Sequence, residues 1–517
     1  MSARAERRCS LAACGLLALA LSCAVGPNYT RPPEPQLPGY AQRPLAPTVP
    51  VGGKSQTFAV SNEVKPDWWR LLRSPAIDAL VEDALTRSPT LEAAQAALRR
   101  SEDSLRAGKG IFFPQADLAG GVSRQRYSPA RVGSSLPGSV FNLFTLSGSI
   151  NYPLDLWGGE RRAVEALGAQ AEGQRYALIG AYLVLSSNVV NTAIAAAAYR
   201  AEIEATRALV ALEEDQVRLG QAQAEAGTVP YANVLSLQSQ LATTRGLLAP
   251  LQQRLEQAES LLATLTGRFA GTWSAPAVTL SELTLPDQLP VSLPAALVRQ
   301  RPDVLIAEAQ LHANTAQIGV ATAAMLPNIT LTASYGVNNP SLTDLTAANS
   351  VFWSLLAGVT QPLFRGGMLY YQRKAAIDTR DQALANYRQT VLGAIEQVAD
   401  SLGALGHDAE AVNAQSEALQ SAADALRLIQ INYQAGLATY LQVLTANEQY
   451  LQGNIGLIQS EAQRLQDTVA LFVALGGGWW NARPAATPAA HTSASPAPSP
   501  AKKGSRLGPL HAAFVGL

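Results

Sequence analysis

Four short stretches of the chain alternate between apolar and polar residues. The clearest is LPNITLTASYGVNN at 326–339, followed by LFTLSGSINYP at 143–153. QADLAGGVS at 115–123 alternates more weakly, and residues 351–361 are the least regular. Period-two alternation is typical of a β-strand with one apolar and one polar face. We therefore predict four strands of about ten residues, long enough to cross a bilayer when tilted; a small soluble sheet is the alternative.

Two very long helical patterns each follow a pair of these strands. They cover 160–226 and 368–435, and each ends at an Ala-Gly turn, AGTVPYANVL or AGLATYLQVL. Glycine commonly ends helices, and 67 helical residues extend about 100 Å. Shorter helices are predicted over 75–111 and 231–266. We expect the second of these to stack end to end with the first helix of the second half of the chain, alongside a long helix.

The same landmarks occur twice along the chain. Pro89 and Pro114 recur 213 residues later, and Pro153, Gly227 and Gly267 recur 209 residues later. Five landmarks in one order indicate two copies of one unit. The predicted segments are a signal peptide, an N-terminal tether with an equatorial segment, repeat 1, an inter-repeat equatorial linker, repeat 2 and a disordered Pro/Ala/Ser-rich tail. Their bounds are 1–22, 23–74, 75–267, 268–287, 288–478 and 479–517.

One part of the first long pattern is uncharged over the length of a membrane span. Residues 178–199 carry no charge in 22 positions, which is enough for a spanning helix. The equivalent part of the second pattern carries Glu396 and Asp400. Because the two units should share one structure, we predict a packed helix here and not a span.

The N-terminus has the features of a secretory signal. Arg4, Arg7 and Arg8 precede a short apolar run, LAACGLLALALS, which is too short to span a membrane. The next residue is Cys23, and a signal that ends at cysteine resembles that of a bacterial lipoprotein. We predict lipidation at Cys23. Cys14, or a plain secretory signal with an incidental cysteine, is the alternative.

Composition excludes several other classes of function. The 517 residues include 39 Lys+Arg and 39 Asp+Glu, and a zero balance without a basic run argues against nucleic-acid binding. All three cysteines lie in the first 23 residues, so no disulfide framework or thiolate metal site is predicted. The four histidines are scattered, and GGKS at 52–55 lacks the rest of a phosphate loop. We predict no enzyme, no cofactor and no metal.

Several motifs together resemble the TolC-like outer-membrane efflux protein family, in the lipoprotein (NodT-type) branch of the RND tripartite efflux systems. They are CAVGPNYTRP, WWRLLRSPAIDALVEDAL, the two FFP/MLP strand starts, PLFRGGMLYYQRKA and the two Ala-Gly turns. Four strands cannot close a barrel, so several copies must assemble. The resemblance implies a mixed α+β membrane protein: a homotrimer with a 12-stranded outer-membrane barrel above a 12-helix periplasmic barrel. Residues 40–74, 268–287 and those after Gly476 would supply an equatorial band.

The resemblance also assigns roles near the two turns. It implies that the hairpin tips contact a periplasmic adaptor, although glycine there also serves the helix end itself. The family's entrance constriction maps to Leu441, a bulky apolar residue, and to Thr445, where an acid is usual. Thr445 therefore puts the usual cation preference in doubt; Glu448 lies one turn further on. The implied adaptor contacts are Gly227, Thr228, Val229, Gly436, Leu437 and Ala438.

The sequence therefore predicts a passive exit duct for drugs or other small toxic compounds. The implied partners are an adaptor (membrane fusion protein), an inner-membrane RND-type transporter and outer-membrane lipid. The same duct serving type I protein secretion or metal export is one alternative. A periplasmic helical scaffold lipoprotein without a pore is an alternative of another class.

Overall fold

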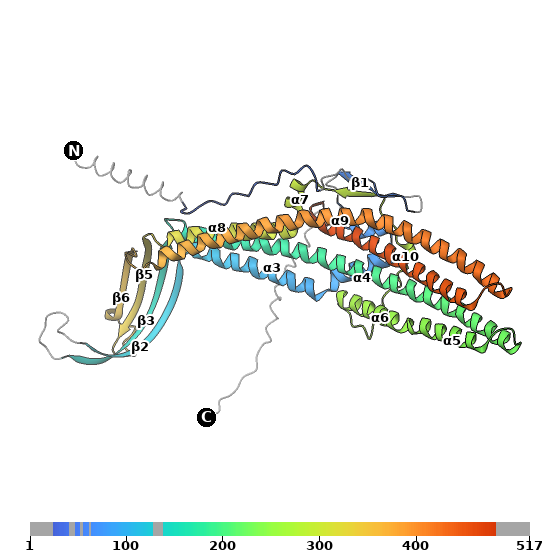
Figure 1. Cartoon of the computed structure of the whole chain (residues 1–517). Coiled ribbons are helices and arrows are strands. Elements are labelled where there is room, and N and C mark those ends of the chain that lie inside the picture. The colour runs from blue at the N-terminus through green and yellow to red at the C-terminus, as the bar shows by residue number, and fades with distance from the viewer. Residues whose placement is uncertain (1–23, 41–46, 52–54, 61–63, 128–137, 482–517) are drawn as a thin grey trace, which may run out of the picture. The chain divides into compact units, whose positions relative to one another are not determined.

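A computed structural model describes residues 24–40, 47–51, 55–60, 64–127 and 138–481. Within these residues, a four-stranded sheet leads into a layer of long helices (Figure 1). Two successive units contain the same order of helices, strands and helical hairpin. The predicted fold class, with four strands and long helical hairpins in two repeats, is confirmed.

The four predicted strands form one antiparallel sheet with the order β2-β3-β5-β6. Three strands, β2, β3 and β5, are longer than the predicted ten residues. Strands β2 and β3 pair residue for residue from Gln115↔Asn151 to Tyr127↔Ser139. This pairing continues through positions where the alternation is weak. The strands are β2 (Gln115–Tyr127), β3 (Ser139–Leu154), β5 (Asn328–Asn339) and β6 (Val351–Thr360).

The two long helices have the predicted lengths, and each of the predicted shorter helices is divided into two. Pro89 starts α3 and separates it from α2, since proline cannot donate a helical hydrogen bond. Pro250 has no backbone N–H to donate to the carbonyl of Gly246, and α5 ends and α6 begins in this region. The helices are α2 (Pro75–Arg87), α3 (Pro89–Gly108), α4 (Gly159–Glu225), α5 (Tyr231–Gly246), α6 (Leu248–Leu265), α7 (Pro294–Gln300), α8 (Pro302–Ala323), α9 (Met368–Gln434) and α10 (Tyr440–Ala474).

The end-to-end stacking of helices differs from the expectation. The return helix was expected to meet the first helix of the second unit, but α6 meets the start of α3, within its own unit (Figure 1). In the second unit α10 likewise ends against the start of α8. The expectation was wrong because it depended on helix lengths alone. These lengths allow α6 to stack either on α3 or on the first helix of the second unit. Both α8 and α6 pack against α4, and they lie on opposite sides of it (Figure 1).

A glycine closes each of these joints. Gly267 and Gly476 have positive φ, 69° and 90°. A Cβ on Gly267 would lie 2.5 Å from the carbonyl oxygen of Arg87, and one on Gly476 would lie 3.0 Å from that of Gln300. Both glycines therefore satisfy a backbone conformation and a close approach that other residues do not.

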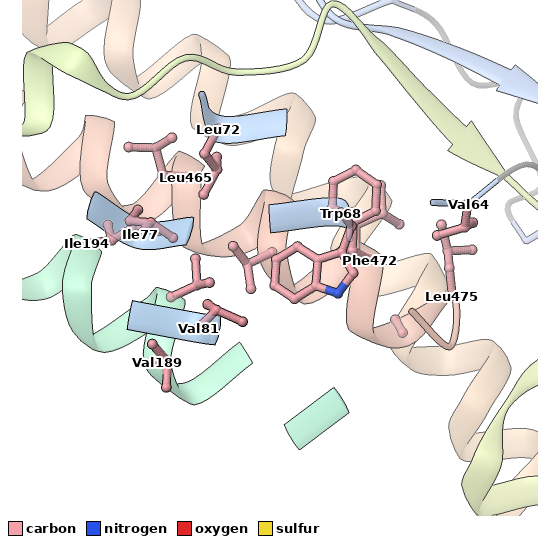
Figure 2. Packing of buried hydrophobic residues seen from close by; sticks show 14 of the residues in the cluster. Val64, Trp68, Leu72, Ile77, Val81, Val189, Ile194, Leu465, Phe472 and Leu475 are labelled. Carbon is pink, nitrogen blue, oxygen red and sulfur yellow. The ribbon is translucent and has the colours of Figure 1, made fainter. Parts of the chain in front are cut away.

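The main core lies midway along the helical layer, where the segment around Trp68 packs between α4 and α10. The Trp68 ring stacks on Phe472 of α10, with centroids 5.8 Å apart. Ile77 and Val81 of α2 lie against Val189 and Ile194 of α4 (Figure 2). The uncharged stretch 178–199 thus contributes to a packed core, as predicted. Among the described residues α4 alone has the length and hydropathy of a membrane span, and half of that window is buried.

The N-terminal segment, the start of repeat 2 and the residues after repeat 2 meet in the same region. Strand β1 (Thr57–Val60) pairs in parallel with β4 (Gln288–Val291). The Asn481 side-chain amide donates to the carbonyl of Val64, and the Trp479 indole donates to that of Gln300. These contacts join residues before and after the two repeats to the start of repeat 2.

We predict that Gly267→Ala destabilises the protein by about 1–3 kcal/mol, because alanine at this φ is strained and its Cβ meets a backbone carbonyl. The midpoint of thermal unfolding in detergent should fall. Gly271→Ala is the matched control, since its Cβ would have no neighbour within 4 Å and Gly271 has no positive φ. Equal midpoints for both variants would contradict this account of the joint.

Candidate functional site

One face of the four-stranded sheet is apolar across all four strands. The strand register aligns Tyr335 with Trp353 and Ala333 with Leu355, and Ile150 with Ala333. Trp353 is 74% exposed, and its apolar neighbours are also largely exposed. Since a soluble monomer rarely exposes such a patch, this face is suited to contact lipid.

The opposite face carries small polar side chains on β3 and β5, several of which hydrogen-bond across the strands, and on β6 it also carries the exposed Leu356. The Thr332 hydroxyl donates to the Asn151 side chain over 2.7 Å, and Ser334 and Ser354 lie 2.7 Å apart across β5 and β6. Side chains that alternate in this way give a barrel a lipid-facing exterior and a polar interior.

Both edges of the sheet are unpaired within the described residues. Strands β2 and β6 each have one neighbour, so one side of each backbone has free N–H and C=O groups. A membrane offers no water to satisfy these groups. The chain therefore holds part of a spanning sheet.

The helical layer, like the sheet, has two edges that no other helix of this chain covers within the described residues. Helix α4 lies between two columns, α3 with α6 and α5 on one side and α8 with α10 on the other. Helix α9 packs against α8 and α10. The layer therefore ends at α9 on one edge and at the α3–α6–α5 column on the other. Both the sheet and the helical layer have two free edges.

Both hairpins turn at the end of the layer far from the sheet (Figure 1). Gly227 and Gly436 have φ of 70° and 73°, and the N–H of each next residue returns to the helix, from Thr228 to Gln223 and from Leu437 to Asn432. This is the hydrogen-bond pattern of a glycine-terminated helix. Gly227, Thr228, Gly436 and Leu437 are exposed, whereas Val229 and Ala438 are half-buried.

The residues assigned to the constriction lie on one exposed stripe of α10. Leu441 and Thr445 are both exposed, and the Thr445 hydroxyl donates to the Leu441 carbonyl. Glu448 follows one turn later and accepts from Gln452. Thr439 and Gln442 form a capping box that begins this helix. The structure thus places Leu441 two turns or fewer from the second tip.

A polar cluster missed by the sequence reasoning holds the N-terminal segment. Arg31 makes two hydrogen bonds to Glu308 of α8, 2.7 and 2.8 Å long, and Tyr29 stacks on His312. His312 also lies 3.0 Å from Glu165 of α4. The segment therefore contacts a helix from each repeat. The motif CAVGPNYTRP was the available signal, but the partners in α4 and α8 are more than 130 residues away.

Glu165 is charged within this cluster. Burial alone would raise the pKa of Glu165, but hydrogen bonds from Arg162 and His312 outweigh it and lower that pKa below its usual value. Arg162 extends the contact to Asn28 of the N-terminal segment. The cluster therefore acts as a charged clamp on residues 25–31. Cys23, which precedes this segment, lies outside the described residues.

The scattered histidines do not form a metal site in the part of the chain that the structure describes. No group of three or more His, Cys, Asp and Glu there could hold a metal ion. His312 belongs to the clamp, and His407 is exposed beside Glu410. His491 and His511 lie outside the described residues.

Comparison with known proteins identifies the family. The family described as outer membrane efflux protein matches residues 80–268 and 293–477. The pyoverdine export outer membrane protein OpmQ of Pseudomonas aeruginosa is 29% identical over 80% of this chain and 88% of its own length. The toluene efflux pump outer membrane protein TtgF of Pseudomonas putida is 28% identical over 90% of this chain and 96% of its own length.

Solved structures show the same fold. The outer-membrane channel OprN superposes with a TM-score of 0.79 at 24% identity, covering 88% of this chain and all of that one. The outer membrane protein VceC from Vibrio cholerae superposes with a TM-score of 0.74 at 26% identity, covering 80% and 99%. Proteins of this kind are channels and not enzymes. The chain therefore belongs to the outer membrane efflux protein family and is the outer-membrane channel of an efflux pump, with a periplasmic helical extension.

Proposed function

We propose that three copies of this chain form the passive exit duct of a tripartite efflux pump for drugs or other small toxic compounds. One observation carries the proposal: a sheet with a lipid-facing and a polar face, open at both edges, leads into a helical layer that is also open at both edges. Such a duct requires a polar lumen and an entrance that opens, and no cofactor. The pore-less scaffold is excluded, because the family consists of channels.

Closing the copies into a ring would cover the free edges of both the sheet and the helical layer. The sheet has an even number of antiparallel strands, so β6 of one copy would run antiparallel to β2 of the next. In the helical layer, α9 of one copy would meet the α3–α6–α5 column of the next, which continues the alternation of long helices and stacked shorter ones. A head-to-tail contact that closes on itself gives cyclic symmetry.

Three copies fit the need for a lumen better than two. Two copies would give a barrel of about eight strands, whose interior is just wide enough for side chains to fill it. Three copies of four strands give about twelve, enough to leave a passage. Helix α4, with 67 residues, would extend the duct by about 100 Å.

The pump partners follow from the relatives and from the exposed tips. Relatives are named for pyoverdine export and toluene efflux. Pyoverdine and toluene are chemically different compounds, although both relatives are outer-membrane proteins of one kind. We therefore assign choice of substrate to an inner-membrane RND-type transporter. A periplasmic adaptor would contact the tips around Gly227, Thr228 and Val229 and around Gly436, Leu437 and Ala438, and Leu441 and Thr445 would line the closed entrance.

A lipid on Cys23 would place this chain in the NodT-type lipoprotein branch. Val25 donates its N–H to the carbonyl of Trp157, and a Cβ on Gly158 would lie 2.6 Å from the Cβ of Ala24. Trp157 and Gly158 connect the end of β3 to α4, so the first described residue after Cys23 lies beside the end of the sheet that leads into the helices. An acyl chain attached there would start at the level of the membrane.

The duct function predicts that the loop between β2 and β3 reaches the cell surface. An epitope tag inserted between Arg131 and Pro137 should bind antibody on intact cells. A tag in the linker near Gly271 should bind antibody only after lysis. Binding to both tags only after lysis would contradict a spanning sheet in this orientation.

The lipid anchor predicts that Cys23→Ala abolishes incorporation of radiolabelled palmitate, because the thiol that carries the lipid is lost. Cys14→Ala should leave incorporation unchanged. Label that persists in Cys23→Ala and disappears in Cys14→Ala would move the lipidated residue.

The adaptor contact predicts that Gly436→Trp weakens chemical cross-linking to the adaptor while the trimer persists. Leu437→Arg, which keeps the glycine and its positive φ, should have the same effect. Gly271→Trp, far from the tips, is the control. Full cross-linking with both tip variants would exclude this surface as the contact.

A further inference from the structure

The two hairpin tips carry no charged side chain over long stretches. Residues 226–244 and 428–447 include no Asp, Glu, Lys, Arg or His. The nearest charges are Glu225 and Arg245 on the first hairpin and Arg427 and Glu448 on the second. Arg245 pairs with Glu214, and Arg427 lies 3.8 Å from Asp424. Ion pairs within these stretches therefore cannot hold neighbouring tips together.

Near its tip, helix α9 has an apolar stripe on its open side. Leu428 and Ile431 are 57% and 56% exposed and lie about one turn apart. Leu426 and Tyr433 are buried at the same level, with the Tyr433 hydroxyl beside Gly220 of α4. At 3.6 residues per turn the exposed pair lies opposite the buried pair. The stripe therefore faces away from this copy's own layer.

Helix α5 has a matching stripe on the other open edge. Tyr231 and Leu235 are 63% and 53% exposed, whereas Val234 and Leu237 are buried against α4, next to Gly220. Tyr231 begins α5, and Ile431 lies three residues before the end of α9. Both stripes are thus within about two turns of a tip. They lie at equal heights on the two edges that a ring would join.

We propose that Leu428 and Ile431 of one copy pack against Tyr231 and Leu235 of the neighbouring copy, and that this contact, the tip clasp, holds the duct entrance closed. The clasp rests on the proposed ring of copies. A second copy is the occupant because each edge supplies an uncharged apolar stripe at the same height. Burying both stripes removes apolar area from water and needs no charge on either side.

An apolar clasp responds to salt differently from an ionic one. Salt at 1 M screens interactions between exposed charges, whereas salts excluded from the protein surface strengthen apolar burial. An entrance closed by the clasp therefore stays closed at high ionic strength. An entrance closed by Glu225 or Arg427 across the seam would open under the same conditions.

The first test is disulfide cross-linking of Leu235→Cys combined with Leu428→Cys. The only other cysteines are Cys9, Cys14 and Cys23 at the N-terminus, so the background is low. Oxidation should give cross-linked multimers that reductant reverses, because a disulfide requires Cα atoms within about 7 Å. Leu235→Cys with Leu392→Cys is the control. Leu392 is also exposed on α9 but lies about 54 Å from Leu428 along the helix.

A second cysteine pair, Tyr231→Cys with Ile431→Cys, repeats the test if the first variant fails to fold. Absence of cross-links in both pairs, with a purified ring still seen by native mass spectrometry, would overturn the clasp and leave the duct function intact. A monomer in the unsubstituted protein would contradict the ring itself. Cross-links to the adaptor in place of a second copy would assign the stripes to that partner and also overturn the clasp.

The second test is conductance in planar bilayers. Leu428→Ser with Ile431→Ser should raise the ratio of open to closed entrances about tenfold, which corresponds to about 1.4 kcal/mol. Leu392→Ser should leave it unchanged. The unsubstituted channel should be as closed at 1 M KCl as at 0.1 M. Opening by salt, or closure unaffected by the paired serines, would overturn the proposal.

Discussion

Free backbone groups along β2 and β6 constrain this protein more than any other feature. Within the described residues each of these strands has one partner, and a bilayer supplies no water for the remaining N–H and C=O groups. The chain is stable in a membrane only when another copy covers both edges. The helical layer repeats the requirement, because it ends at α9 on one side and at the α3–α6–α5 column on the other. One head-to-tail contact meets both needs.

The long helices have to stay in register with the sheet for that closure to work. Asp155 accepts hydrogen bonds from the N–H groups of Glu160 and Arg161, so the first turn of α4 is fixed directly after β3. Midway along, Gly267 and Gly476 close equivalent joints in the two repeats. The clamp around Glu308 ties the N-terminal segment to helices of both repeats. The joints and the clamp therefore link helices of both repeats to each other and to the N-terminal segment.

Residues 226–244 and 428–447 include no Asp, Glu, Lys, Arg or His, so no charged side chain within them can close the entrance. Thr445 is the position at which the family resemblance predicts an acid, and the nearest acid on α10 is Glu448, one turn further from the tip. An apolar contact between copies can close such an entrance, and a partner that competes for the same apolar surface can open it. Closure of the entrance and binding of the adaptor would then use neighbouring surfaces near the same turns.

The sequence by itself determined the repeats, the four strands and the two long helices, because period-two and period-3.6 patterns are local. It also located both tips through Gly227 and Gly436, since a helix that ends at glycine has a local signature. The tertiary structure decided which helices stack, which placed α6 against α3 and α10 against α8. It also revealed the clamp between Arg31 and Glu308. These contacts join residues far apart in the chain, and helix length and periodicity are the same for every alternative pairing.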